Sequence, residues 1–289
     1  MNSPRETPTW VLWGVLALFI AVYSPILYYM ALHWKIVPDY SHGFLIVPLA
    51  IYFAWQRKPL LEAAKIGGTW WGLVPLALGL AALAVGRLGV ELMAMRTGFV
   101  VSLIGMVLLL FGLPVFRILI FPLLFLFLMV PLPQALVNVV AFPLQLIAAD
   151  AAVQSLHVLR VPALLEGNII HLANAELFVD QACSGLRSLM ALITLGVVFA
   201  YFFRQNTVER VIIVLSAIPV AILVNAFRVA LTGILTYRYG EQAAGGAIHE
   251  FQGLITFGTA FLLLMVEARV MDWIRLWRKT STRSAERLA

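Results

Sequence analysis

The chain holds one cysteine among its 289 residues, and its neighbours are of the types that a nucleophile needs. Cys183 lies in the segment Asp-Gln-Ala-Cys-Ser-Gly-Leu-Arg-Ser, just before a run of apolar residues and four positions ahead of Arg187. A thiol attacks as thiolate, and its pKa of about 8.5 falls at a helix N-terminus or beside a cation. A helix over the apolar run would supply both, because Arg187 then shares the face of Cys183.

Two later segments add the remaining groups of an acyl-transfer site. Arg228 lies in Leu-Val-Asn-Ala-Phe-Arg-Val-Ala-Leu-Thr-Gly, with Asn225 and Thr232 on the same helical face, and His249 begins the segment His-Glu-Phe-Gln-Gly. A guanidinium can bind a carboxylate through two hydrogen bonds or stabilise an oxyanion. An imidazole can transfer the proton that a leaving amine and an incoming nucleophile require. Whether Arg187 or Arg228 contacts the thiolate stays open.

Each of these residues also has a purely structural interpretation. A lone cysteine in a membrane helix is often a small packing residue. Arg187, near a helix end, can extend to the interface, and Arg228 can pair with a carboxylate. His249 alone would be an ordinary interfacial histidine. The placement of all four on one side of a membrane favours the chemical interpretation.

The amino-acid composition is that of an integral membrane protein. Hydrophobic residues make up 62% and charged residues 12% of the chain, against roughly 45–50% and about 25% in soluble domains. The mean hydropathy is +0.96. A spanning helix needs about 20 mostly apolar residues. Eight stretches are candidates, at approximately residues 10–32, 43–56, 69–86, 98–113, 117–132, 186–203, 211–235 and 250–270.

The basic residues orient these helices. With the N-terminus inside, thirteen of the twenty lysines and arginines are cytoplasmic, as the positive-inside rule favours. Both termini are then cytoplasmic, and Cys183, Arg228 and His249 lie in the outer part of the membrane. The net charge of +6 is explained by topology and by contact with anionic lipid, so no nucleic acid is implied.

The external segment 133–185 is expected to have structure of its own. Its first part has apolar residues at helical spacing, interrupted by Pro143, and predicts one or two helices at the outer interface. In its second part, Asn168–Leu172 and Glu176–Asp180 favour a β-hairpin that leads to Cys183.

The predicted fold is an all-α polytopic membrane protein. It has about eight transmembrane helices, with a short extracytoplasmic interfacial helix and a β-hairpin segment before helix six. Residues 1–272 form one membrane domain, and residues 273–289 form a basic cytoplasmic tail that we expect to be partly disordered.

Four short motifs resemble those of a known family. They are Ala-Cys-Ser-Gly-Leu-Arg-Ser-Leu at 182–189, Asn-Ala-Phe-Arg-Val at 225–229, His-Glu-Phe-Gln-Gly at 249–253 and Asp-Tyr-Ser-His-Gly at 39–43. The pattern closely resembles the exosortases, which are bacterial polytopic relatives of the archaeosortases, and the similarity covers about residues 10–270. It implies a multi-pass protein of the bacterial inner membrane whose active site faces the periplasm.

The resemblance implies a cysteine transpeptidase with a Cys/Arg/His site. Cys183 would attack the carbonyl carbon at the sorting motif, Arg228 would stabilise the reacting oxygen or orient the thiolate, and His249 would protonate the leaving group. The motifs add the supporting or substrate-binding residues Arg187, Ser184, His42 and Asn225. No task can be given to His42, which can also simply anchor the turn between the first two helices.

The family's substrates are exported, membrane-anchored proteins that end in a Pro-Glu-Pro motif, a hydrophobic helix and a basic cluster, and they are linked to exopolysaccharide and biofilm matrix production. Two alternatives remain open. The same site could release its product by hydrolysis as a cysteine protease, or the protein could be a transporter or flippase of saccharide intermediates, or a scaffold, in which Cys183 is incidental. The five histidines are dispersed, so no metal site is expected. No cofactor is implied, and the acceptor is not identified.

Overall fold

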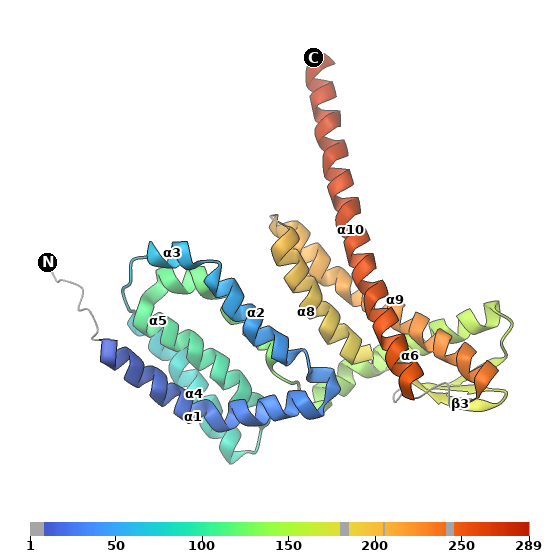
Figure 1. Cartoon of the computed structure of the whole chain (residues 1–289), viewed down its shortest axis with the longest axis horizontal. Helices are drawn as coiled ribbons and strands as arrows, with labels where there is room; N and C mark the ends of the chain where they lie inside the picture. Colours follow the sequence, from blue (N-terminus) through green and yellow to red (C-terminus); the bar gives the residue numbers. More distant parts are fainter. Residues whose placement is uncertain (1–8, 180–184, 205, 241–245, 289) are drawn as a thin grey trace. The chain divides into compact units, whose positions relative to one another are not determined.

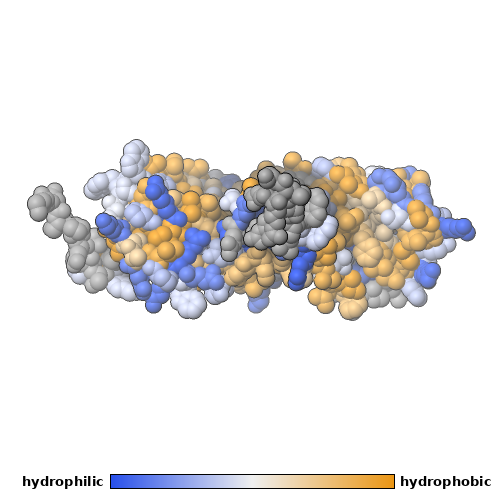
Figure 2. Space-filling view, turned by 90° about the horizontal axis from the view of Figure 1, so that it is seen from above, coloured by the Kyte–Doolittle hydropathy of each residue, from blue (hydrophilic) through white to orange (hydrophobic). Residues whose placement is uncertain are grey.

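The computed structural model describes residues 9–179, 185–204, 206–240 and 246–288. They belong to two compact units, Met1–Gln134 and Ala135–Ala289, which are treated one at a time. Figure 1 traces the elements of both along the chain. Many large apolar side chains on the helices are exposed, among them Leu18, Leu78 and Leu223, and Figure 2 shows orange hydrophobic surface on both units. Such surfaces suit contact with lipid.

The first unit is helical. Its longer helices are α1 (Thr9–Ile36), α2 (Gly43–Trp55), α4 (Leu73–Leu88) and α5 (Leu92–Phe125). Short elements connect or extend them: η1 (Pro38–Tyr40), α3 (Lys58–Glu62), η2 (Trp70–Gly72) and η3 (Leu126–Met129).

A tyrosine joins three of these helices. The hydroxyl of Tyr23 on α1 lies 2.7 Å from Oγ of Ser102 on α5, and 3.3 and 3.2 Å from the carbonyl oxygens of Gly79 and Gly98. The glycine on α4 allows this approach, because a Cβ at Gly79 would collide with Ser102. Small residues at helix contacts in membranes work in this way, since they let backbones come close enough to pack well.

Helix α5 is broken at Gly112, where φ is +84° and ψ is −177°. This conformation is open essentially to glycine. A Cβ at Gly112 would also collide with the carbonyl oxygen of Gly67. The boundary that the sequence predicted between spans 98–113 and 117–132 therefore lies within a few residues of a real break in the helix.

The second unit combines helices with a small antiparallel sheet. The elements are α6 (Gln134–Val158), β1 (Ala163–Glu166), β2 (Ile169–Leu172), β3 (Ala175–Phe178), α8 (Gly185–Phe203), α9 (Thr207–Tyr239) and α10 (Gly246–Leu288). Within the described ranges the strands pair in the order β1-β2-β3. The predicted hairpin is β2 and β3. Strand β1 was not predicted, because Ala-Leu-Leu-Glu shows no alternation of apolar and polar residues.

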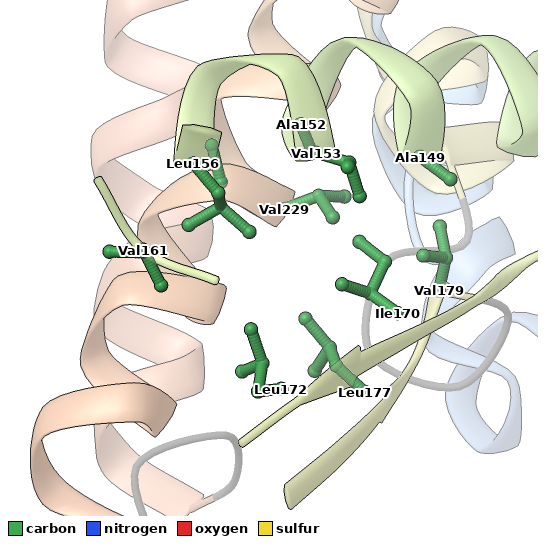
Figure 3. Packing of buried hydrophobic residues seen from close by; sticks show 11 residues of the cluster. Ala149, Ala152, Val153, Leu156, Val161, Ile170, Leu172, Leu177, Val179 and Val229 are labelled. Atoms are coloured by element: carbon green, nitrogen blue, oxygen red, sulfur yellow. The ribbon is translucent and has the colours of Figure 1, made fainter. Parts of the chain in front are cut away.

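A hydrophobic core holds the sheet against α6 and α9. As Figure 3 shows, Ile170 of β2, Leu177 of β3 and Val179, which follows β3, lie beneath α6 together with Val229 of α9. All four side chains are at most 3% exposed. The remaining buried members are Ala149, Ala152, Val153, Leu156, Val161, Leu172 and Ala230. The sheet is thus fixed to the helix that carries Arg228.

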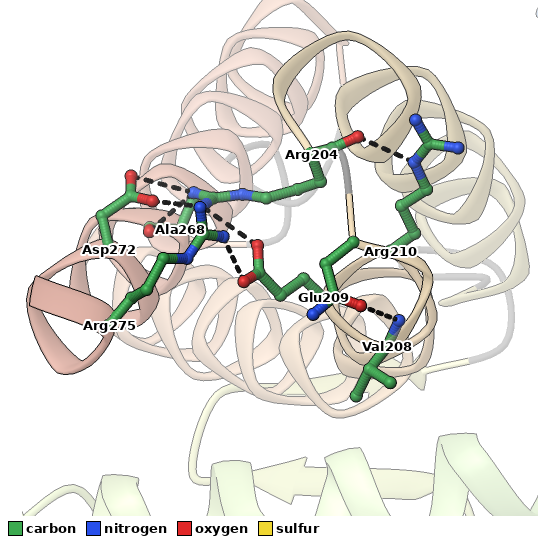
Figure 4. Close-up of polar contacts among 8 residues, drawn as sticks. Arg204, Val208, Glu209, Arg210, Ala268, Asp272 and Arg275 are labelled. Atoms are coloured by element: carbon green, nitrogen blue, oxygen red, sulfur yellow. Dashed lines mark hydrogen bonds and ion pairs between the residues drawn. The ribbon is translucent and has the colours of Figure 1, made fainter. Parts of the chain in front are cut away.

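A polar network joins the turn between α8 and α9 to α10 (Figure 4). The Arg204 side chain is 4% exposed and donates to Asp272 at 2.5 Å and to the carbonyl oxygen of Ala268 at 2.6 Å. Arg275 pairs with Glu209 at the start of α9. Because a buried guanidinium must be paired, this network fixes the position of α10 along α9.

The predicted count of eight spans is not confirmed. In the part of the chain that the structure describes, six helical segments are long and apolar enough to cross a membrane: Trp13–Ile36, Trp70–Leu88, Leu92–Met129, Gln134–Val158, Thr207–Tyr239 and Phe251–Arg275. Length explains part of the difference. Helix α2 has 13 residues, or about 20 Å at about 1.5 Å per residue, against a hydrocarbon core of about 30 Å.

Two other predictions need revision in this light. The predicted spans 98–113 and 117–132 belong to one long segment with the break at Gly112. The predicted span 186–203, by contrast, coincides in its bounds with α8, whose apolar part Leu189–Phe203 is shorter than the six candidates. The predicted interfacial segment is one continuous helix through Pro143, α6, and it is long enough to span.

The C-terminal tail is described as part of the last helix. Residues 273–288, for which partial disorder was expected, continue α10 as helix to Leu288. The ion pair of Arg275 with Glu209 supports the first turn of this extension. Half of the twelve residues that follow are arginine, alanine, glutamate or leucine, which are strong helix formers.

Candidate functional site

The predicted site residues Arg187, Arg228 and His249 belong to helices α8, α9 and α10. Cys183 and Ser184 lie outside the described residues, immediately before the first residue of α8, Gly185. Arg187 is the third residue of α8 and His249 the fourth residue of α10, and for these two the description covers the helical backbone. Asn225 and Arg228 lie on α9, and their side chains are described.

The three helices alternate in direction, as Figure 1 shows. A short connection joins α8 to α9, and pairs such as Ser216–Glu267 and Thr232–Gln252 fit antiparallel packing of α9 on α10. The N-termini of α8 and α10 therefore lie at the same end as the C-terminal half of α9. One buried cluster joins all three helices: Leu189, Leu192, Ala217, Ala221, Val224 and Ala260. This packing brings the described backbone of residues 185–189, 225–229 and 249–253 toward one end of the helix group.

Arg228 is a buried charge on α9. It is 7% exposed, and Asn225, one turn earlier, is 5% exposed. The guanidinium lies against α10, because a methyl group added at Gly253 would be 3.7 Å from Nη2 of Arg228. The motifs Asn-Ala-Phe-Arg-Val and His-Glu-Phe-Gln-Gly therefore meet in space, although 25 positions separate Arg228 and Gly253 in the sequence.

A hydrogen bond fixes this contact. Oγ1 of Thr232, which is fully buried one turn after Arg228, lies 2.9 Å from Oε1 of Gln252 and 2.9 Å from the carbonyl oxygen of Arg228. Thr256 continues the polar face of α10, with Oγ1 2.9 Å from the carbonyl oxygens of Gln252 and Gly253. Sequence analysis placed Thr232 on the face of Arg228 but assigned Thr256 nothing. Its spacing of four from Gln252 was the available signal.

Two buried amide groups keep unused hydrogen-bonding capacity. Within the described residues, Oδ1 of Asn225 and Nε2 of Gln252 have no hydrogen-bond partner. Gln252 is 2% exposed, and buried polar groups of this kind are normally satisfied. One amide offers an acceptor and the other a donor, which are the two groups that a peptide bond complements.

His42 belongs to the first unit, so its relation to the residues of α9 and α10 stays a prediction. The histidine precedes α2, and its Nδ1 lies 3.1 Å from the carbonyl oxygen of Asp39. Burial lowers the pKa of His42, against the opposing effect of hydrogen bonds to the backbone of Leu128 and Asp39. The neutral ring is therefore favoured near neutral pH.

The first unit also contains a cavity without catalytic groups. Its volume is about 470 Å³, and its walls come from α1, α2, α5 and η3, with Met30, Ala50, Phe99 and Leu123 among the lining residues. The Trp34 ring nitrogen at this wall donates to the carbonyl oxygen of Met129 at 3.0 Å. The lining side chains are apolar, so this space offers no group for acid, base or nucleophilic chemistry.

These features define a polytopic membrane protein with a buried polar contact between two of its C-terminal helices. A sequence profile described as transmembrane exosortase matches residues 34–266. The match covers most of the chain and includes all four motifs, so the chain belongs to the transmembrane exosortase family. Comparisons with curated proteins and with solved structures gave no match.

Proposed function

We propose that this protein is a membrane-embedded cysteine transpeptidase. It cleaves exported, membrane-anchored proteins at a C-terminal Pro-Glu-Pro type sorting signal and transfers the acyl group to an acceptor. Family membership supports this proposal, since exosortases are in general cysteine transpeptidases that act on membrane-associated substrates with sorting signals. The finer assignments of signal, residues and acceptor are our proposal.

The contact between Arg228 and Gly253 carries the proposal. An arginine within a membrane segment costs about 2.5–3.5 kcal/mol on insertion scales, so its retention calls for a function or a strong pairing. Here the guanidinium lies beside the helix that begins near His249, one turn from that residue. We assign proton transfer to the His249 imidazole and stabilisation of an oxyanion to the Arg228 guanidinium.

The chemistry proceeds in two steps. The Cys183 thiolate attacks the carbonyl carbon of the scissile peptide bond, and Arg228 stabilises the oxyanion of the tetrahedral intermediate. The C–N bond then breaks, the leaving amine takes a proton from His249, and a thioester remains on Cys183. In the second step an acceptor amine or hydroxyl gives its proton to His249 and attacks the thioester, and Cys183 leaves as thiolate.

Asn225 completes the polar face of α9 as a proposed supporting residue, one turn before Arg228. Arg187 and Ser184 flank the nucleophile and would orient it or the substrate glutamate. His42 completes the proposed set as a supporting residue from the first unit.

The proposed setting follows from topology. The protein resides in a bacterial inner membrane with both termini in the cytoplasm, and the site faces the periplasm. A substrate whose cleavage site lies just outside its own membrane helix can diffuse laterally to a nucleophile at that depth. Its basic tail stays inside by the same rule. We associate the products with exopolysaccharide and biofilm matrix.

Co-expression with a substrate tests the proposal. A protein that ends in Pro-Glu-Pro, an apolar helix and an arginine cluster is produced with the wild type, with Cys183→Ala and with Arg228→Lys. We expect processing by the wild type, none with Cys183→Ala and much less with Arg228→Lys, because lysine lacks the planar fork. Arg238→Lys, at an exposed position of the same helix, is the matched control and should process normally.

Two results bear directly on the mechanism. Processing that persists in Cys183→Ala, with equal membrane insertion, would remove the nucleophile. The mass of the new C-terminus separates transfer from hydrolysis: an added acceptor mass supports the transpeptidase, and a free carboxylate on all product supports the protease.

A further inference from the structure

Strand β3 is an edge of the sheet, and its pairing with β2 determines which of its backbone groups face β2 and which face outward. Ile169 of β2 pairs with Phe178 of β3, and one position beyond this pair the N–H of Val179 donates to the Asn168 carbonyl oxygen at 3.0 Å. Hydrogen-bonded pairs alternate along an antiparallel ladder. Leu177 therefore directs its backbone groups toward β2, whereas Glu176 and Phe178 direct theirs away from the sheet.

The opposite edge of the sheet, strand β1, independently supports this assignment of inward and outward backbone groups. By the same alternation, Ala163 of β1 directs its backbone groups outward, and its carbonyl oxygen accepts a hydrogen bond from Nε2 of His157 on α6 at 2.7 Å. The β1 edge is thus partly capped from within the protein. Among the described residues, no backbone hydrogen bond reaches the outward groups of Glu176 and Phe178 on β3.

The open edge is held rigidly beside the candidate site. Leu177 and Val179 are 3% and 0% exposed in the core with α6 and α9. The Asn174 side-chain amide, in the turn before β3, donates to the carbonyl oxygens of Thr236 and Tyr237 at 3.3 and 3.1 Å. These two residues lie in the last turn of the helix that carries Arg228 two turns earlier, so β3 is attached to that helix.

The chain links this edge to the nucleophile over a short distance. Cys183 is five positions after Phe178, and an extended chain of that length reaches at most about 17 Å. A peptide paired with β3 would therefore run close to the part of the chain that carries the Cys183 thiol. Phe178 is 43% exposed on this strand and offers an apolar contact to alternate side chains of such a peptide.

We propose that β3 binds the substrate by β-augmentation: an extended segment of the exported polypeptide next to its cleavage site adds as a further strand to the Glu176–Phe178 edge. This rests on the proposed function. Two outward residues provide at most four backbone hydrogen bonds, which suits a substrate that must bind and leave more than a permanent partner. Main-chain pairing supplies the binding, and side chains at alternate positions supply the selectivity.

Disulfide crosslinking tests the pairing, because Cys183 is the sole cysteine. Cys183→Ala removes every thiol and prevents turnover, and Phe178→Cys then places one on the edge. Substrates carry a single cysteine at successive positions before the cleavage site. We expect the crosslinking yield to alternate with period two along the substrate, since alternate residues of a strand face the same side. Leu164→Cys, an exposed position on β1, is the matched control and should crosslink weakly at all positions.

A second pair of variants tests the outward N–H. Glu176→Pro removes that group while the N–H of Leu177 still faces β2, and Glu176→Ala loses the same ion pair with His171 but keeps the N–H. Relative to Glu176→Ala, the proline variant should raise KM for the substrate about fivefold, the effect of one lost hydrogen bond, with kcat nearly unchanged.

The outcomes separate this inference from the proposed function. If the wild type does not process the substrate, the transpeptidase proposal fails and β3 pairing fails with it. If the wild type processes the substrate but crosslinks show no period of two, or β1 crosslinks as well as β3, only β-augmentation is overturned. Equal KM values for Glu176→Pro and Glu176→Ala would also overturn it.

Discussion

The hydrogen bond between Thr232 and Gln252 should make a measurable contribution to the packing of α9 on α10. Thr232→Val keeps the shape of the side chain and removes the hydroxyl, which lies 2.9 Å from Oε1 of Gln252. Thr232 and Gln252 are 0% and 2% exposed, so water cannot replace the lost donor. Hydrogen bonds between membrane helices contribute about 0.6 kcal/mol on average and up to about 1.7 kcal/mol.

The expected loss for Thr232→Val is about 1–2 kcal/mol, because the buried Gln252 oxygen is left without this donor. Reversible unfolding in mixed detergent micelles measures the change in unfolding free energy. Thr259→Val on α10 is the matched control, since its hydroxyl bonds only within its own helix and is exposed. That variant should stay within about 0.5 kcal/mol of the wild type.

A double-mutant cycle with Gln252→Leu isolates the pair. If the two side chains interact as described, the double variant loses about 0.5–1.5 kcal/mol less stability than the sum of the single losses. Losses that add to within about 0.3 kcal/mol would refute the contact, and with it the register that brings Arg228 to Gly253.

Three further perturbations follow from the same coordinates. Arg204→Ala should destabilise the protein by about 2–3 kcal/mol in the same unfolding assay, because it removes charge-assisted hydrogen bonds to Asp272 and the Ala268 carbonyl oxygen. An unchanged unfolding free energy would show that the network is dispensable. Burial lowers the pKa of His42 in the folded state, so stability should be complete above the unfolded pKa of about 6.5 and fall as pH drops below it. Between pH 7.5 and pH 5.5 the melting temperature should fall less for His42→Gln than for the wild type. Equal falls in melting temperature would contradict the lowered pKa of His42. Gly112→Ala should sharply reduce the folded yield, because a Cβ there would collide with the backbone of Gly67 and the backbone conformation favours glycine. The control Gly258→Ala should be harmless, since a Cβ at Gly258 meets no atom within 4 Å. Similar yields for the two variants would count against the break in α5.

Local sequence properties were enough to establish the class of protein and its family. Hydropathy is a sum over neighbouring residues, so membrane helices such as α4 and α9 could be predicted from composition alone. The β-leaning run before Cys183 was recognised in the same way. The motifs around Cys183, Arg228 and His249 indicated the exosortases, and the family match bears this out.

Other features depended on contacts that no local pattern records. Whether α6 is one helix or two depends on whether neighbouring residues support the chain at Pro143, and strand β1 exists because β2 pairs with it. The break at Gly112 serves a close approach to Gly67, which lies far away in the sequence.

The candidate site was likewise predictable from the sequence only in part. From the sequence alone, Arg228 and Gln252 are polar residues in two apolar helices, and their spacing places each on a face of its own helix. Which faces meet is decided by the tertiary structure, through the Arg204 network at one end of α9 and α10 and the Thr232–Gln252 hydrogen bond at the other. Helix phase is a local property, whereas the register between two helices is set by the packing energy of all their contacts together.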